Sequence, residues 1–212
     1  MEGKRESFAN WASYSLFKWT IISPVLHVYF RVNIHGVENV PTSGGIIAVS
    51  NHASYFDPPI ISNCVGRPVA FMAKEELFKI PVFNQGIRLY GAYPVKRSTG
   101  DRAALRAAAK AIKAGWIAAV FLQGTRDPSA KISDPKLGAA WIAAQAQVPL
   151  LPISLWGTNK ILTKGSFLPK PVPITVRIGE MISPPASTKK ADLRAVTENC
   201  AEVINALHDL GR

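Results

Sequence analysis

Residues 45–57 read Gly-Ile-Ile-Ala-Val-Ser-Asn-His-Ala-Ser-Tyr-Phe-Asp, and two prolines follow them directly. The first six residues form a short apolar run that is typical of a buried central strand, and the polar residues and prolines after it predict a loop. His52 and Asp57 therefore follow the carboxyl end of a strand, where ligands bind in open α/β sheets. A histidine beside a carboxylate can be held in one tautomer and act as a general base. The same spacing also fits a helix cap at His52 and a simple turn at Asp57.

Strand-like and helix-like segments alternate along most of the chain. Besides residues 45–50, short apolar or alternating runs predict strands at 28–34, 69–73, 92–95, 116–122, 150–155 and 174–178. Helix-forming composition and end signals predict helices at 81–89, 101–114, 135–147 and 189–208. Because such alternation implies a sheet covered on both faces, we predict an α/β fold. Its sheet is mixed, mainly parallel, of about six or seven strands, and flanked by helices.

Composition limits the partners. The chain has 212 residues, a net charge of +11 and a pI near 9.9, which favours nucleic acid, an anionic membrane surface or a phosphorylated substrate as partner. Nucleic acid is not expected, because the cations are dispersed and no RRM, KH or helix-turn-helix pattern occurs. The two cysteines, Cys64 and Cys200, lack metal-ligand spacing. We therefore expect neither a metal site nor a disulfide framework, as in a reducing cytosolic environment.

The amino terminus is unusually aromatic. Between Ser7 and Phe30 the only charged residue is Lys18, and the longest uncharged apolar part, residues 19–30, is shorter than the roughly 20 residues of a membrane-spanning helix. Aromatic rings near cations suit the headgroup layer of a bilayer. We predict a membrane-associating helical segment at 1–30 and an α/β domain at 31–212, peripheral or monotopic on the cytoplasmic face of a membrane. An ordinary helix packing its aromatics on the core is the alternative.

Two further segments place cations after predicted strands. Residues 91–97 end in Lys96 and Arg97, and Gly124 and Arg126 follow the strand at 116–122. The ends of parallel strands converge at one edge of the sheet, so both arginines are expected to face the same cleft as His52. Guanidinium groups bind phosphate through paired hydrogen bonds.

The order and content of these segments resemble the 1-acylglycerol-3-phosphate acyltransferase family, the lysophosphatidic acid acyltransferases. Asn51-His52 with Asp57 resembles the family's NHxxxxD block, and residues 91–97 are similar to its second block. Residues 121–126 resemble the third block, usually FPEGTR, and residues 148–154 the apolar fourth block. Residues 136–140 also resemble the lysine-glycine helix start that follows the third block. The resemblance covers about residues 30–180.

This resemblance implies acyl transfer from an acyl thioester, carried by coenzyme A or by acyl-carrier protein, to the free hydroxyl of 1-acylglycerol 3-phosphate, which gives phosphatidate. His52 would be the general base and Asp57 would orient it. The expected phosphate ligands are Arg97, Arg126 and Lys74, and the expected groups for oxyanion stabilisation and acceptor positioning are Gly124, Thr125 and Gln123. The co-substrate thioester would be the donor, with no metal or other cofactor.

Two neighbouring positions depart from the family's third block: Gln123 stands where Glu is usual, and Leu122 where Pro is usual. Loss of a negative charge beside Arg97 and Arg126 is expected to affect the choice of acceptor. The sequence leaves open a sister acyltransferase that acts on glycerol 3-phosphate or another lysophospholipid. A non-catalytic membrane or lipid-binding protein is a further alternative, although it would not need the His52 and Asp57 pair.

Overall fold

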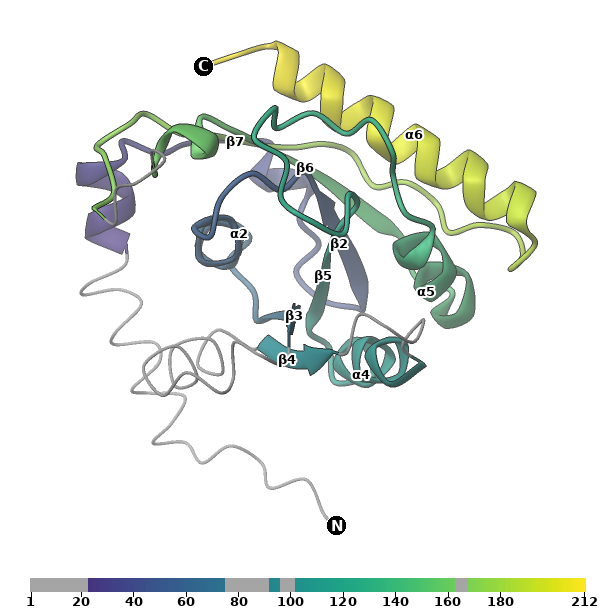
Figure 1. The fold of residues 1–212 in the computed structure, drawn as a ribbon. Coiled ribbons are helices and arrows are strands. Elements are labelled where there is room, and N and C mark those ends of the chain that lie inside the picture. Colours follow the sequence, from purple (N-terminus) through teal and green to yellow (C-terminus); the bar gives the residue numbers. More distant parts are fainter. Residues whose placement is uncertain (1–22, 75–91, 96–101, 163–167) are drawn as a thin grey trace.

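The computed structural model describes residues 23–74, 92–95, 102–162 and 168–212 (Figure 1). Within these ranges the strands are β1 (Asn33–His35), β2 (Ile46–Ser50), β3 (Val69–Lys74), β4 (Ala92–Val95), β5 (Ile117–Phe121), β6 (Leu150–Trp156) and β7 (Thr175–Ile178). The longer helices are α2 (Asp57–Cys64), α4 (Arg102–Lys113), α5 (Gly138–Ala146) and α6 (Lys190–Asp209). Short helical turns occur at η2 (Val25–Tyr29), η3 (Val37–Asn39) and η6 (Thr158–Lys160).

The strands form one sheet in the order β1-β7-β6-β2-β5-β3-β4. Neighbouring strands are parallel at every pairing except β6 with β7, which are antiparallel. The predicted α/β fold with a mixed, mainly parallel sheet is therefore confirmed. Because β2, β5, β3 and β4 point the same way, the loops after them lie at the same edge of the sheet.

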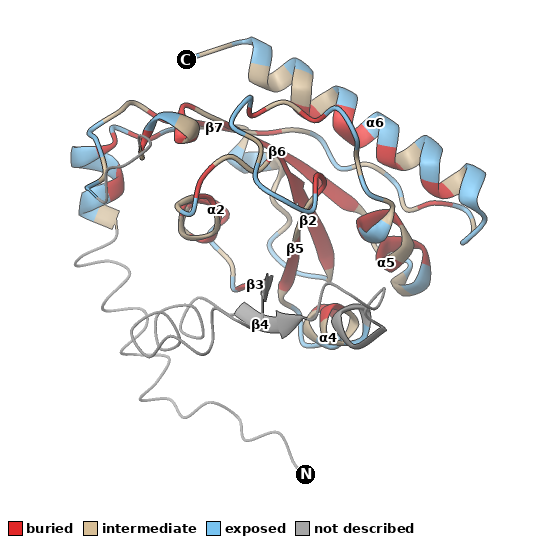
Figure 2. Ribbon diagram, viewed as in Figure 1, coloured by how far each residue is buried: buried red, intermediate tan, exposed pale blue. Residues whose placement is uncertain are grey.

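Helices cover both faces of the sheet, and the alternation of side chains along β2 explains why. Ile46 and Ala48 belong to the core on the α2 side, whereas Ile47 and Val49 belong to the core under α4, α5 and α6. All five residues of β2 are buried, and Figure 2 shows the central strands as the most buried part of the molecule. A strand covered on both faces is apolar along most of its length, as residues 45–49 predicted, and only Ser50 at the end of β2 carries a polar side chain.

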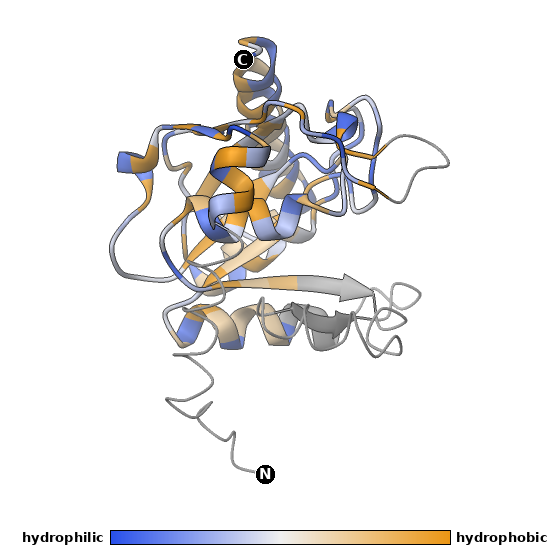
Figure 3. Cartoon of the chain, turned by 90° about the vertical axis from the view of Figure 1, so that its left-hand side faces the viewer, coloured by the Kyte–Doolittle hydropathy of each residue, from blue (hydrophilic) through white to orange (hydrophobic). Residues whose placement is uncertain are grey.

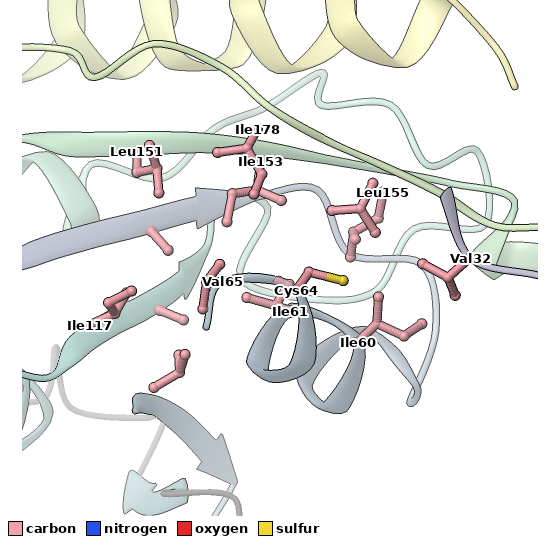
Figure 4. Packing of buried hydrophobic residues seen from close by; sticks show 14 of the residues in the cluster. Val32, Ile60, Ile61, Cys64, Val65, Ile117, Leu151, Ile153, Leu155 and Ile178 are labelled. Atoms are coloured by element: carbon pink, nitrogen blue, oxygen red, sulfur yellow. The ribbon is translucent and has the colours of Figure 1, made fainter. Parts of the chain in front are cut away.

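α2 packs its apolar side onto the sheet. Ile60, Ile61 and Cys64 contact the aliphatic side chains of β5 and β6 (Figure 4). On the other face the long helix α6 is amphipathic, with hydrophobic and hydrophilic residues side by side along it (Figure 3). Its buried positions include Leu193, Cys200 and Ile204, which recur at helical spacing. The hydrophobic effect therefore holds three layers together: helix, sheet and helices.

The two cysteines lie on opposite faces of the sheet, Cys64 in one core cluster and Cys200 in the other. Burial raises the pKa of the Cys200 thiol to about 12, so this thiol stays protonated and packs as a small apolar group. Within the described ranges, no group of three or more His, Cys, Asp or Glu side chains could hold a metal ion.

The predicted strand at 28–34 is wrong in its first half. Residues 25–29 form the turn η2, and the strand begins only at Asn33. Leu26 and Phe30 are both buried, and their spacing of four residues lets one helical turn place both on the core. Alternating apolar residues fitted a strand equally well, so local pattern did not distinguish the two.

The predicted helix at 81–89 and most of the predicted membrane segment, residues 1–22, lie outside the described residues. Residues 26 and 30 of that segment pack into the core of the α/β domain. Among the helices that the structure describes, none is long and apolar enough to span a bilayer.

Candidate active site

His52 and Asp57 form a close pair at the carboxyl end of β2. The Nδ1 atom of His52 lies 2.7 Å from Oδ2 of Asp57. An ionised carboxylate only accepts hydrogen bonds, so Nδ1 carries the proton in this pair and Nε2 presents its lone pair. No described residue forms a hydrogen bond with Nε2. The histidine is therefore held in the tautomer that a general base needs.

The start of α2 positions the carboxylate of Asp57. Asp57 is the first residue of the helix, where a negative charge interacts favourably with the helix dipole. Its Oδ2 atom also accepts the backbone N–H groups of Ala53 and Ser54, at 2.7 and 2.8 Å. Pro58 and Pro59 follow and supply no N–H to compete for it. The carboxylate therefore faces back along the chain to His52.

The Phe121 ring packs against one face of the His52 imidazole and so orients it. The two rings stack with their centroids 3.9 Å apart and their planes 12° from parallel. With one ring face on Phe121 and the Nδ1 edge on Asp57, the His52 side chain remains 15% exposed. The imidazole is thus fixed in place and still partly accessible to a substrate.

The loop after β5 lies against the loop after β2. The backbone N–H of Leu122 donates to the Ser50 carbonyl, and the N–H of Asp127 donates to the His52 carbonyl at 2.8 Å. The first and third sequence blocks are therefore joined by main-chain hydrogen bonds around the catalytic candidate.

Gln123 links this loop to His52 through its side chain. Its Oε1 atom accepts the backbone N–H of His52 at 2.8 Å, and its Nε2 atom donates to the Lys131 carbonyl at 2.9 Å. The side chain is buried, with 8% exposed. Only an amide satisfies both partners, because a carboxylate cannot donate to a carbonyl. Position 123 thus holds the His52 backbone in place.

Gly124 and Thr125 form the exposed turn of the third block. Gly124 has φ near +69°, in the left-handed region that glycine occupies without strain. Its N–H donates to the Phe121 carbonyl at 3.0 Å and so is already used within the turn. The next two N–H groups, of Thr125 and Arg126, have no hydrogen-bond acceptor within the described part of the chain.

Arg126 lies beside the His52 loop, on Tyr55. Its guanidinium carbon is 3.4 Å from the centre of the Tyr55 ring, and one guanidinium nitrogen donates to the Tyr55 hydroxyl at 2.7 Å. Both residues are exposed. The stacking on the aromatic ring keeps a positive charge next to the site and still open to solvent.

Of the other two predicted phosphate ligands, Lys74 and Arg97, only Lys74 lies in a segment that the structure describes. Lys74 is the last residue of β3, where its backbone pairs with Val95 of β4, at the same edge of the sheet as His52. Arg97 lies outside the described residues.

Asn51 has a role that the sequence did not reveal. The side chain is fully buried; its Nδ2 donates to the carbonyls of Ala130 and Leu155, and its Oδ1 accepts the Leu155 N–H. It thereby continues the pairing of β2 with β6 beyond the last residue of β2. In turn, Asn205 of α6 exchanges two hydrogen bonds with the backbone of Ile132. Nothing local at residue 51 or 205 indicates these contacts, which join segments 73 to 104 residues apart.

Comparison with known proteins places these blocks in a family. The family model described as Acyltransferase matches residues 31–156. A chloroplastic 1-acyl-sn-glycerol-3-phosphate acyltransferase of Brassica napus is 33% identical over 151 residues, 70% of this chain and 43% of that protein. The 1-acyl-sn-glycerol-3-phosphate acyltransferase of Borreliella burgdorferi is 27% identical over 155 residues, 72% of this chain and 62% of that protein.

A solved structure extends the match to nearly the whole chain. The 1-acyl-sn-glycerophosphate acyltransferase PlsC from Thermotoga maritima superposes with a TM-score of 0.78 at 31% identity, covering 99% of this chain and 83% of that one. The chain spans less than half the length of the Brassica relative and over four fifths of the Thermotoga one. The chain therefore belongs to the acyltransferase family, among the 1-acylglycerol-3-phosphate acyltransferases that its sequence blocks resemble.

Proposed function

We propose that this protein transfers an acyl group from an acyl thioester to the free hydroxyl of 1-acylglycerol 3-phosphate and so produces phosphatidate. The observation that carries the proposal is the His52 and Asp57 pair, 2.7 Å apart, with the cation Arg126 on the adjoining loop. The names of the relatives point to the same acceptor. No metal or further cofactor is needed in this proposal, because the thioester is already activated.

His52 performs the proton transfers. As the acceptor oxygen attacks the thioester carbonyl carbon, Nε2 takes the hydroxyl proton and the imidazole becomes imidazolium, which the carboxylate of Asp57 stabilises. The tetrahedral intermediate collapses with breakage of the carbon–sulfur bond. The thiolate then leaves with the proton returned from Nε2, so the enzyme ends in its starting state.

The oxyanion of the intermediate needs hydrogen-bond donors. We assign this role to the N–H groups of Thr125 and Arg126, since the Gly124 N–H is already bonded to Phe121. Successive N–H groups next to a left-handed glycine are a common anion-binding arrangement. Gly124 is then required for the shape of the turn, and its own N–H is not the donor.

A transfer assay with the purified protein in lipid or detergent tests the proposal. Lysophosphatidate and glycerol 3-phosphate are compared as acceptors, each with acyl-coenzyme A and with acyl-carrier protein as donor. We expect phosphatidate from lysophosphatidate. Turnover of glycerol 3-phosphate in place of lysophosphatidate would assign the protein to the sister activity, and no turnover of either would refute the proposal.

Arg126→Ala should weaken acceptor use. Loss of a charge-assisted hydrogen bond to phosphate costs about 1.5–3 kcal/mol, so KM for lysophosphatidate should rise roughly 10- to 100-fold while kcat changes little. The fold should be unaffected, because Arg126 is exposed. Tyr55→Phe is the matched control: it keeps the ring under the guanidinium and removes only the hydroxyl, and its KM should change less than about threefold. Equal KM values for Arg126→Ala and the parent would exclude Arg126 as a phosphate ligand.

Gln123→Glu tests the departure from the family's third block. The carboxylate can still accept the His52 N–H, but it faces the Lys131 carbonyl without a proton to donate. We expect a loss of about 1–3 kcal/mol in unfolding free energy and a lower kcat, with KM for lysophosphatidate nearly unchanged. Denaturant unfolding and steady-state kinetics measure these effects. A selective change in acceptor KM or preference would instead show that residue 123 contacts the acceptor.

Residues 1–22 are proposed to attach the protein to the cytoplasmic face of a membrane. A truncation should stop there, because Leu26 and Phe30 belong to the core. We expect the protein lacking residues 1–22 to fold and to lose most of its binding to vesicles that contain phosphatidylglycerol, as measured by flotation. The exposed Val37 of η3 provides a control: Val37→Ala in the full chain should float normally. Undiminished flotation of the truncated protein would refute the anchor.

A further inference from the structure

α4 carries a stripe of positive charge. Arg106, Lys110 and Lys113 are spaced four and three residues apart, which places them on one face of the helix, and all three are exposed. Arg102, at the first position of α4, continues the same spacing in the sequence. The helix contains no Asp or Glu.

These charges are not used within the part of the protein that the structure describes. None of the three side chains forms an ion pair or hydrogen bond there. α6 differs, since it mixes acidic and basic residues and pairs Arg194 with Glu198. An unpaired row of like charges repels itself and favours an anionic partner.

A groove runs beside the stripe, between α4 and α5. Its volume is about 570 Å³. Arg106 and Lys113 line it together with apolar residues such as Ile112 and Ile142, the Trp141 ring and the amide of Gln145. A hollow with an apolar floor and a cationic rim suits an amphipathic helix with acidic residues along one side.

The topology connects this surface to the active-site edge. β4 runs parallel to β3, so α4 begins at the sheet edge where β2 and β5 end in the His52 and Gln123 loops. It ends at the opposite edge, since β5 starts four residues after Lys113. Its 12 residues span about 18 Å. A helix lying on α4 could therefore present one end to the active-site edge.

We infer that the groove between α4 and α5, with its basic stripe, docks an acidic helical protein that carries the acyl group as a thioester. This inference rests on the proposed acyl transfer, which requires a thioester donor. The acidic helix of the carrier would pair with Arg106, Lys110 and Lys113, and its thioester arm would reach His52 around the carboxyl edge of the sheet.

A bilayer fits this surface less well. Among the side chains that the structure describes, the exposed large apolar ones that would enter a membrane include Val25, Val28, Tyr29 and Leu168, and none of the exposed ones lies in residues 106–113 of α4 or in α5. In Figure 1 residues 23–30 lie at the upper left, whereas α4 lies at the bottom. The apolar surface and the basic stripe thus face different partners.

The test is a charge reversal, Arg106→Glu with Lys110→Glu and Lys113→Glu. Its matched control is Lys189→Glu with Lys190→Glu and Arg194→Glu at the start of α6, which changes the net charge by the same amount at three exposed positions. KM is measured with acyl-carrier protein and with acyl-coenzyme A, using lysophosphatidate as acceptor. Binding of carrier protein without an acyl group is measured separately. Gln145→Trp, which fills the groove without changing its charge, is a second variant.

We expect the α4 triple variant to raise KM for acyl-carrier protein at least about tenfold and to abolish carrier binding, with KM for acyl-coenzyme A within about twofold of the parent. Gln145→Trp should act in the same direction and the α6 control should not. The inference would be overturned if the α4 triple variant raised KM equally for both donors, changed KM for neither, or lost only its binding to vesicles. It would also be overturned if the parent protein did not bind the carrier. Failure of the parent to acylate lysophosphatidate with any donor would refute the proposed function, whereas carrier binding would still report on the groove.

Discussion

Replacing His52 by alanine should reduce kcat for phosphatidate formation by about 10²–10⁴-fold, the range expected for loss of a general base. The ring is 15% exposed and its removal leaves Oδ2 of Asp57 bonded to the N–H groups of Ala53 and Ser54. The variant should therefore fold, with an unfolding midpoint close to that of the parent. The rate of phosphatidate formation is measured in a single-turnover assay, and the unfolding midpoint is measured in denaturant on the same preparation.

Asp57→Asn and His35→Ala complete this experiment. Asn keeps the shape and one acceptor oxygen but cannot stabilise an imidazolium by charge, so kcat should also fall by about 10²-fold or more. His35 is an exposed histidine in β1, and its replacement should leave kcat unchanged. If His52→Ala retained more than about a tenth of the parental kcat while folded, the base would have to be another group.

Asn51→Ala should cause the largest loss of stability among these variants. It leaves the Leu155 N–H, the Leu155 carbonyl and the Ala130 carbonyl without their side-chain partner in a buried site. At about 1–3 kcal/mol for each unsatisfied group, with partial relaxation, the expected cost is about 3–5 kcal/mol. Total stabilities are typically about 5–15 kcal/mol, so much of the protein should unfold under mild denaturant.

Two further variants, Asn51→Asp and Asn39→Ala, test whether the loss of stability comes from the buried hydrogen bonds of Asn51. Aspartate keeps the acceptor for the Leu155 N–H but turns a carboxylate toward two carbonyls, so it should be no more stable than alanine. Asn39 makes one part-buried hydrogen bond, to the Ile178 carbonyl, and its loss should cost only about 1 kcal/mol. An Asn51→Ala variant as stable as Asn39→Ala would show that the buried amide does not hold β2 to β6.

Local sequence pattern predicted most of the architecture because the central strands, such as β2 and β6, are buried on both faces. The run at 45–49 has no polar side chain and is followed by Ser50, and the structure covers β2 with helices on both sides. The alanine-rich helix ending near Gly115 was equally clear. The pattern failed at 28–34, where alternating apolar residues favoured a strand although Phe30 also forms a helical pair with Leu26, four residues before it.

The sequence alone identified the groups to which we assign the proposed reaction: a histidine and an aspartate after one strand, and a cation after another. Tertiary structure decided how they are held, because the supporting contacts join residues far apart in the chain. Gln123 shows the difference. Its place near Arg126 in the sequence predicts a role in acceptor recognition, and only the structure shows that its amide bonds to the backbone of His52 and Lys131. Hydrogen-bond partners depend on which segments meet, and only the folded chain brings residues 51, 123, 130 and 155 together.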